Sequence, residues 1–223
     1  MCGRYVRAQP LDLSIDAMGV DVEPDLLAQL HADDEPRWNI APSQRGFIAA
    51  LDVNGDVGIA KHRWFFMTPR GPRINMRSES AHRVPDYAPL FDRQRCVVFA
   101  SGFYEPEGDK ATEKNRPWWY FKPRDDRPLF FGGVVKEDGF TILTRAPVKP
   151  VAGIHDRSPV FIPADNVVAW LDPDIRGQDA LARFAPAGYG ECLECWRVSD
   201  DAKKPKNEGP SLIEPLQQSA GLF

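Results

Sequence analysis

The sequence is poor in cysteine and has no long apolar run. Its four cysteines, Cys2, Cys96, Cys192 and Cys195, are too few and too scattered in 223 residues for a disulfide framework, which favours a reducing compartment. No stretch approaches the ~20 apolar residues of a membrane helix, and the first residues lack the basic start and apolar centre of a signal peptide. We therefore expect a cytoplasmic protein with no membrane partner.

A complete metal site is missing as well. Cys192 and Cys195 have the spacing of half a zinc site, but no second cysteine pair and no nearby histidine pair completes it. We expect both residues to be ordinary thiols in or beside a late strand, and we expect neither a metal nor another cofactor.

Basic residues are absent from residues 11–35, which carry eight acidic residues. The net charge of the chain is −4, yet residues 61–95 carry eight basic residues against three acidic ones. This asymmetry permits a basic groove on an acidic body. Charge alone fits scattered, solvated arginines equally well.

Apolar runs bounded by turn residues predict a chain rich in strands. We expect strands over residues 46–51, 57–66, 96–100, 118–121, 129–135, 140–143, 159–162 and 195–198, and short helices over 25–31, 164–171 and 178–184. Asn54 and Gly55 tolerate positive φ and predict a hairpin between the first two strands. A second hairpin is expected between 118–121 and 129–135, and the first forty residues are expected to be mostly loop.

These elements predict an α+β fold. We expect a single domain over residues 1–199, with a curved, mainly antiparallel, barrel-like sheet core and peripheral helices. The polar residues 200–223 are expected to form a flexible tail.

The residues with the most distinctive chemistry are Met1, Cys2 and Gly3. Removal of Met1 leaves Cys2 with a free α-amine, and this 1,2-aminothiol titrates near pH ~8 at the amine and ~8.5 at the thiol. The thiolate can attack an acyl carbon with its own amine as base, or both heteroatoms can condense on an aldehyde to close a thiazolidine ring. In an arbitrary chain, such a cysteine is more often inert.

Four further segments are polar where a strand or turn does not need to be. They contain Trp38 and Asn39 before a proline, Asn75 and Arg77 before Glu79, Glu105 at the end of an apolar strand, and His155 before Asp156 and Arg157. A carboxyl group at the edge of a dry strand has a raised pKa that suits proton transfer. Each residue also has an ordinary alternative: the asparagines as turn residues, Glu105 as an ion-pair partner and His155 as a loop histidine.

Taken in order, and together with the N-terminal start, these segments resemble the SOS-response-associated peptidase (SRAP) family. The resemblance rests on residues 1–5, 38–44, 74–79, 96–105, 142–147 and 155–160, and it covers the chain from Cys2 to about Ile162. It implies the fold of that family and the protection of abasic sites in single-stranded DNA by a covalent cross-link at the N-terminal cysteine. Single-stranded DNA containing abasic sites is then the expected partner, and the protein would be associated with the nucleoid when bound to it.

The residue chemistry fits that reaction. Cys2 is the expected nucleophile, His155 moves a proton at the ring oxygen of the closed sugar, Glu105 shuttles protons between the amine and the leaving water, and Asn75 holds the sugar or the amine. The residues expected to contact DNA are Arg4, Arg77 and Arg157 at phosphates, Trp38 or Trp64 as a stacking face, and Asn39.

The sequence departs from the family pattern at three places. Pro106 replaces a usual tryptophan, Ser158 replaces a usual methionine, and the usual Trp-Gly-Leu run is absent at Trp64. These changes leave the nucleophile, Glu105 and His155 intact, so they bear on how the DNA is held.

Two other functions fit parts of the sequence. An N-terminal-nucleophile glutaminase also starts Met-Cys-Gly. Of the other motifs of that class, the sequence shows only a partial match at Asn54–Asp56, which is better explained as a hairpin turn. A non-catalytic module for single-stranded DNA would make Cys2 incidental and would bind regardless of the lesion. The peptidase label of the family refers to trimming of its own N-terminus. Since Cys2 directly follows Met1, general proteolysis is not implied.

Overall fold

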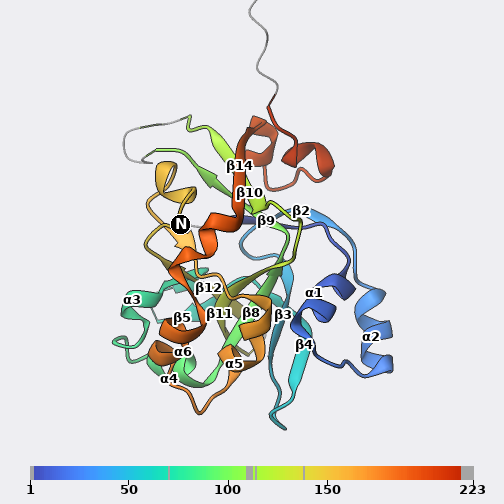
Figure 1. The fold of residues 1–223 in the computed structure, drawn as a ribbon, viewed down its shortest axis with the longest axis vertical. Coiled ribbons are helices and arrows are strands. Elements are labelled where there is room, and N and C mark those ends of the chain that lie inside the picture. The colour runs from blue at the N-terminus through green and yellow to red at the C-terminus, as the bar shows by residue number, and fades with distance from the viewer. Residues whose placement is uncertain (1–2, 70, 109–112, 114, 138, 217–223) are drawn as a thin grey trace, which may run out of the picture.

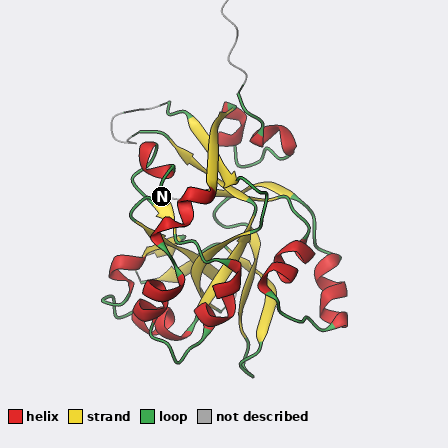
Figure 2. Cartoon of the chain, viewed as in Figure 1, coloured by secondary structure: helices red, strands yellow, loops and turns green. Residues whose placement is uncertain are grey.

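The chain folds around two β-sheets, and its strands alternate between them (Figure 1). The computed structural model describes residues 3–69, 71–108, 113, 115–137 and 139–216. Most of the strand pairs are antiparallel, and helices lie around the outside of the strands (Figure 2).

The first sheet has five strands in the order β14-β10-β9-β1-β2, each antiparallel to its neighbour. These strands are β1 (Arg4–Arg7), β2 (Arg37–Ile40), β9 (Gly102–Pro106), β10 (Trp118–Pro123) and β14 (Leu193–Val198). Because β1 pairs with β9 on one edge and with β2 on the other, the start of the described chain is held firmly within this sheet.

The second sheet has seven strands, and it closes on itself because β11 pairs with both β8 and β12. Its main order is β11-β8-β3-β4-β12-β13, and β7 runs parallel to β12 beside this path. The strands are β3 (Arg45–Leu51), β4 (Val57–Arg63), β7 (Asn75–Arg77), β8 (Arg95–Ala100), β11 (Leu129–Lys136), β12 (Gly139–Arg145) and β13 (Ser158–Pro159). A separate small ribbon pairs β5 (Phe66–Thr68) with β6 (Gly71–Arg73).

The helices are short and cover the closed sheet. They are α1 (Leu11–Met18), α2 (Pro24–His31), α3 (Ser78–Ala81), α4 (Ala88–Arg93), α5 (Val167–Leu171) and α6 (Gly177–Phe184). The described residues also form five 3₁₀ segments: η1 (Val151–Gly153), η2 (Ala164–Asn166), η3 (Ala187–Cys192), η4 (Asp200–Lys203) and η5 (Pro210–Ile213). None of the helices in the described part of the chain is long and apolar enough to cross a membrane.

Burial explains why the apolar runs form these strands. Every residue of β8 is buried, as a continuous apolar run covered on both faces requires. One face contributes Val97 and Phe99 to a core shared with the helices, and the other contributes Cys96 and Val98 to a core between the sheets. Alternate residues of β8 therefore pack into two different cores, one on each face of the strand.

The predicted fold class is confirmed: the protein is α+β, with mainly antiparallel sheets and peripheral helices. The hairpin around Asn54 and Gly55 is confirmed as well, since β3 and β4 pair in register from Arg45 opposite Arg63 to Leu51 opposite Val57.

The second predicted hairpin is wrong. Strand β10 pairs with β9 and β14, whereas β11 pairs with β8 and β12 in the other sheet. Both edges of each strand are therefore occupied, and the chain between them crosses from one sheet to the other. Helix α1 was also missed, because its buried residues Leu11, Ile15 and Met18 are interspersed with acidic and polar positions.

Residues 200–216 differ from the flexible tail expected of them. They form η4 and η5, with Ala202 and Leu212 buried, and the Leu216 amide donates to the Arg197 carbonyl at 2.8 Å. Residues 217–223 lie outside the described residues. We call residues 200–216 the C-terminal clasp.

Candidate active-site cleft

A cleft of about 1140 Å³ opens where the ends of both sheets meet. The first sheet contributes Gly3, just before β1, and Trp118 at the start of β10. The second sheet contributes Arg77 at the end of β7, and the loop before β13 contributes His155 and Arg157. Segments far apart in the sequence therefore share one wall.

Glu105 lies in β9 between two residues that line the cleft, Tyr104 and Pro106, and is itself fully buried. In the sheet it is opposite Trp119 of β10, and its neighbour Tyr104 is opposite Arg4 of β1. The pKa of Glu105 is raised to about 8, mainly by burial and to a smaller extent by the charge of Asp156. The carboxyl group is therefore mostly protonated at neutral pH.

His155 lies against this carboxyl group. Its Nε2 atom is 3.7 Å from Oε2 of Glu105, and its Nδ1 atom is 3.1 Å from both the backbone nitrogen and the backbone oxygen of Arg157. Burial lowers the pKa of the imidazole. A neutral acid and a neutral imidazole thus lie side by side, an arrangement that suits proton transfer more than a permanent ion pair.

Cys2 lies outside the described residues. Its neighbour Gly3 lines the cleft, and β1 begins at the next residue, Arg4. The residue that follows Cys2 in the chain therefore lies at this cleft.

Asn75 is half-buried at the start of β7, in register with Ile142 of β12. It is two residues before Arg77, so the two side chains share one face of the strand. Asn75 is not among the described residues that line the cleft.

Arg77 and Arg157 have different environments, although both line the cleft. Arg77 is exposed, and no ion pair with a described residue engages its guanidinium group. Arg157 is buried and donates from both terminal nitrogens to Glu79, at 2.7 and 2.8 Å. Glu79 therefore engages both terminal nitrogens of Arg157, and the phosphate contact expected of Arg157 stays a prediction.

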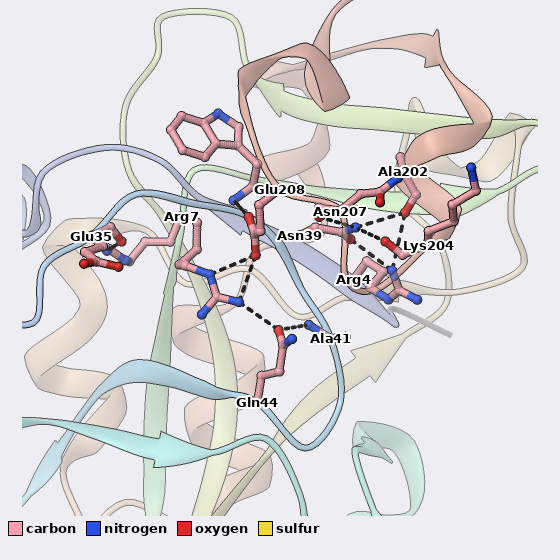
Figure 3. A network of polar contacts seen from close by, with 12 residues as sticks. Arg4, Arg7, Glu35, Asn39, Ala41, Gln44, Ala202, Lys204, Asn207 and Glu208 are labelled. Atoms are coloured by element: carbon pink, nitrogen blue, oxygen red, sulfur yellow. Dashed lines mark hydrogen bonds and ion pairs between the residues drawn. The ribbon is translucent and has the colours of Figure 1, made fainter.

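The surroundings of Asn39 do not support its expected DNA contact, whereas Arg4 lines the cleft and its expected phosphate contact stays a prediction. Asn39 is fully buried, and its side-chain nitrogen donates to three carbonyl groups of the C-terminal clasp (Figure 3), those of Ala202, Lys204 and Asn207. Arg4 donates to the Asn39 side-chain oxygen at 3.0 Å and to the Ala202 and Lys203 carbonyl groups at 3.3 Å each. Both side chains fasten the clasp to β1 and β2.

Of the two tryptophans expected to stack on a base, Trp64 is fully buried. Its ring packs edge-on against Tyr5 at 5.2 Å, and its Nε1 donates to the Ile74 carbonyl at 2.8 Å. The expectation that it stacks on a base is therefore wrong. Trp38 is half-buried and does not line the cleft among the described residues.

Trp118 is the aromatic residue that sequence reasoning missed. It lines the cleft, is half-buried, and lies directly opposite Pro106 across β9 and β10. Arg116 lines the cleft as well and donates to the Gly108 carbonyl at 3.1 Å. The clue in the sequence was the Trp118-Trp119 pair, because one residue of such a pair in a strand must face away from the core.

The described residues contain no group of three or more His, Cys, Asp or Glu side chains placed to hold a metal ion. Cys192, one half of the zinc-like spacing, donates its thiol to the Tyr189 carbonyl at 2.9 Å.

Comparison with known proteins identifies relatives of similar length. "Abasic site processing protein YedK" of Escherichia coli is 27% identical over 230 aligned positions, which cover 97% of this chain and 100% of that protein. "Abasic site processing protein YoqW" of Bacillus subtilis is 26% identical, with coverage of 96% and 99%.

Two solved structures share the fold. A protein from Bacteroides thetaiotaomicron superposes with a TM-score of 0.75 at 15% identity, covering 97% of this chain and 100% of that one. A phage-related protein from Bordetella bronchiseptica gives a TM-score of 0.71 at 21% identity, with coverage of 88% and 94%. The family profile described as SOS response associated peptidase (SRAP) matches residues 1–205 of the chain. The chain therefore belongs to the SRAP family.

Proposed function

We propose that this protein senses and shields abasic sites in single-stranded DNA by forming a covalent thiazolidine cross-link through Cys2 after removal of Met1. The names of its relatives support a role at abasic sites, since several are called abasic site processing proteins. The finer statement, that the link is covalent and involves Cys2, is our own inference from the cleft.

One observation carries this proposal. His155, whose Nε2 atom is 3.7 Å from Oε2 of Glu105, lines the same cleft as Gly3. Consecutive Cα atoms are about 3.8 Å apart, so covalent geometry keeps Cys2 next to Gly3. We infer that the aminothiol of Cys2 acts in this cleft.

The proposed reaction begins with the sugar. An abasic deoxyribose is mostly a closed hemiacetal, and neutral His155 accepts the hydroxyl proton and returns one to the ring oxygen as the ring opens. The Cys2 amine then adds to the aldehyde carbon and forms a carbinolamine. Glu105, protonated at neutral pH, donates a proton to the departing hydroxyl group, which leaves as water.

The second half of the reaction closes the ring. The Cys2 thiol adds to the imine carbon and the imine nitrogen takes up a proton, which leaves a thiazolidine. In total, one aldehyde, one amine and one thiol give one thiazolidine and one water. No oxidant or external energy source is required.

The rest of the cleft suits a single strand of DNA. Arg77 is exposed and free of ion pairs with described residues, which leaves its donors available to a phosphate. Trp118 offers a partly exposed aromatic face, on which an unpaired base can stack.

A gel assay tests the proposal. The full chain is incubated with an oligonucleotide containing one abasic site, and the heat-stable adduct is measured under denaturing conditions. We expect an adduct with wild type, none with Cys2→Ser, and an undiminished adduct with the control Cys195→Ser. An equal adduct from Cys2→Ser would overturn the assignment of Cys2, and glutamine hydrolysis without any adduct would favour the glutaminase alternative.

A further inference from the structure

Trp119 is the residue of β10 that lies directly opposite Glu105, and the proposed reaction gives it no role. Side chains directly opposite each other in an antiparallel pair lie on the same face of the sheet, with Cβ atoms about 4.5–5.5 Å apart. The indole ring of Trp119 is therefore a direct neighbour of the buried carboxyl group.

The indole ring is also anchored at its far end. Its Nε1 atom donates to Oε2 of Glu107 at 2.8 Å. The pairing of the two strands extends to Glu107, because the Glu107 amide donates to the Pro117 carbonyl at 2.8 Å. Since side chains alternate along a strand, Glu105 and Glu107 share one face. The ring of Trp119 therefore starts beside Glu105 and reaches Glu107, a residue that lines the cleft.

The neighbour of Glu105 on the other side has no side chain. Strands β1 and β9 pair with Arg4 opposite Tyr104. Continuing this antiparallel register by one residue places Gly3 opposite Glu105, and Gly3 lines the cleft. The carboxyl group thus has an indole ring on one side and a glycine on the other.

We propose that Trp119 is a positioning residue, whose ring closes off Glu105 from the rim of the cleft near Glu107 and leaves the approach beside Gly3. This proposal rests on the proposed function of the cleft, since it assigns the ring to a proton-transfer group of that reaction. Glu107 is the anchor of the ring.

The environment of the carboxyl group fits such a wall. Glu105 is fully buried, although Glu107, two residues further along, is only half-buried. Burial is the main reason why the pKa of Glu105 is raised to about 8. Of the charged or titratable groups among the described residues, Nε2 of His155 lies 3.7 Å away, Asp156 raises this pKa and Arg116 lowers it. Access of water through the wall should therefore return the pKa toward its ordinary value of 4.5.

A ring that only fills space predicts a different result from a ring that closes off Glu105. In the first case, loss of the ring lowers cross-linking by the same factor at every pH. In the second case, the loss is small while Glu105 is protonated in both proteins, and it grows as the pH rises because the variant gives up this proton at a lower pH. The ratio of variant to wild-type rate constants separates the two cases. It also cancels the titration of the Cys2 amine, which both proteins share.

The experiment measures cross-linking rate constants against pH, at saturating DNA, on an oligonucleotide that carries a permanently open aldehyde. We expect the ratio of Trp119→Leu to wild type to fall ~10-fold or more between about pH 5 and about pH 7.5. The matched control is Trp196→Leu, which also removes an indole ring with a hydrogen-bonded Nε1, but on the opposite face of the same sheet. Its ratio should not change with pH. A constant ratio for Trp119→Leu would overturn the proposal.

Glu107→Ala is the second variant, in case Trp119→Leu does not fold. It removes the anchor of the ring at a half-buried position, whereas Glu107→Gln removes the charge and keeps an oxygen that can accept from Nε1. We expect the ratio to fall with rising pH for Glu107→Ala and to stay constant for Glu107→Gln. The same fall in both variants, or a fall in neither, would overturn the proposal.

A titration without DNA separates this proposal from the proposed function. The carboxyl carbon signal of Glu105, identified by its absence from Glu105→Gln, is followed against pH by NMR. We expect a lower pKa in Trp119→Leu than in wild type and an unchanged pKa in Trp196→Leu. Equal values in Trp119→Leu and wild type would overturn the proposal, whereas failure of wild type to cross-link would count against the proposed function alone.

Discussion

Glu105 is a carboxyl group that the fold keeps from water. Its raised pKa and the lowered pKa of His155 have the same main cause, burial in the wall between β9 and the loop before β13. Two groups whose charged forms are both disfavoured can exchange protons with a substrate near neutral pH.

The two groups should be separable by substrate. His155→Ala should slow cross-linking to a natural abasic site ~10²-fold or more and should slow an open-aldehyde analogue far less, whereas Glu105→Gln should slow both. Rate constants for both variants on both substrates test this prediction. Equal losses for His155→Ala would mean that it does not act on ring opening.

The buried carboxyl group should also make stability depend on pH. The pKa of Glu105 rises from 4.5 to about 8 on folding, so the folded state binds the proton more tightly than the unfolded state. Its contribution is fully present below pH 4.5 and is lost as the pH rises toward about 8. The free energy of unfolding of wild type, relative to Glu105→Gln, should fall by on the order of a few kcal/mol over this range. Parallel curves from urea titrations would refute the shift.

Arg77 is an exposed cation among the described residues of the cleft, and its removal should act through phosphate contacts. Arg77→Ala should weaken binding to any single strand and lower the slope of log affinity against log salt by about one. Arg127→Ala serves as control, since Arg127 is paired with Asp125 outside the cleft. An unchanged slope for Arg77→Ala would place the DNA elsewhere.

At the scale of residues, local patterns indicated which side chains are polar but not what surrounds them. Glu105 at the end of an apolar strand and His155 in a polar loop lie 3.7 Å apart, and their proton-transfer roles stay predictions. Trp64 and Asn39 do not face solvent, because a packed ring and hydrogen-bonded partners cover them. Those partners lie far away in the sequence, and no local pattern reports them.

At the scale of elements, the C-terminal clasp holds β1, the strand that follows Gly3. Besides the contacts of Asn39 and Arg4, Glu208 accepts from the Arg37 side chain and from the Trp38 amide, both at 2.8 Å (Figure 3). Strands β1 and β2 are thereby fixed from the side opposite β9.

Loss of the clasp contacts should destabilise the protein. Asn39→Ala would remove the hydrogen bonds that its side chain donates to three carbonyl groups of the clasp and the one that it accepts from Arg4. We expect a loss of about 2–3 kcal/mol in the free energy of unfolding. Urea denaturation checks this, with Gln178→Ala on the exposed face of α6 as control, expected within about 0.5 kcal/mol of wild type. A wild-type midpoint for Asn39→Ala would show that the clasp is not held by these contacts.

The elements themselves were easier to predict than their pairing. The hairpin of β3 and β4 follows from one turn between adjacent strands, whereas β10 and β11 are adjacent in sequence but belong to different sheets. The clasp was unexpected because its composition is polar. The clasp is held by its backbone carbonyl groups, which accept hydrogen bonds from Arg4 and Asn39. Amino-acid composition does not predict such backbone contacts.

At the scale of the whole molecule, the cleft exists because the chain alternates between two sheets. Gly3, Glu105 and Trp118 belong to the first sheet or its start, while Arg77 and the loop with His155 are placed by the second. Neither sheet alone assembles the site. The sequence motifs name several of these residues, but only the packing of the two sheets brings them to one cleft.

The central claim is that Cys2 forms a covalent link with an abasic site, and intact mass spectrometry tests it most directly. Purified protein is measured before and after incubation with an oligonucleotide containing one abasic site, followed by heating without reductant and peptide mapping. The account predicts a protein without Met1 and a stoichiometric product equal to protein plus oligonucleotide minus one water, mapped to Cys2. No product, a product mapped to another residue, or an equal product with an undamaged oligonucleotide would contradict it.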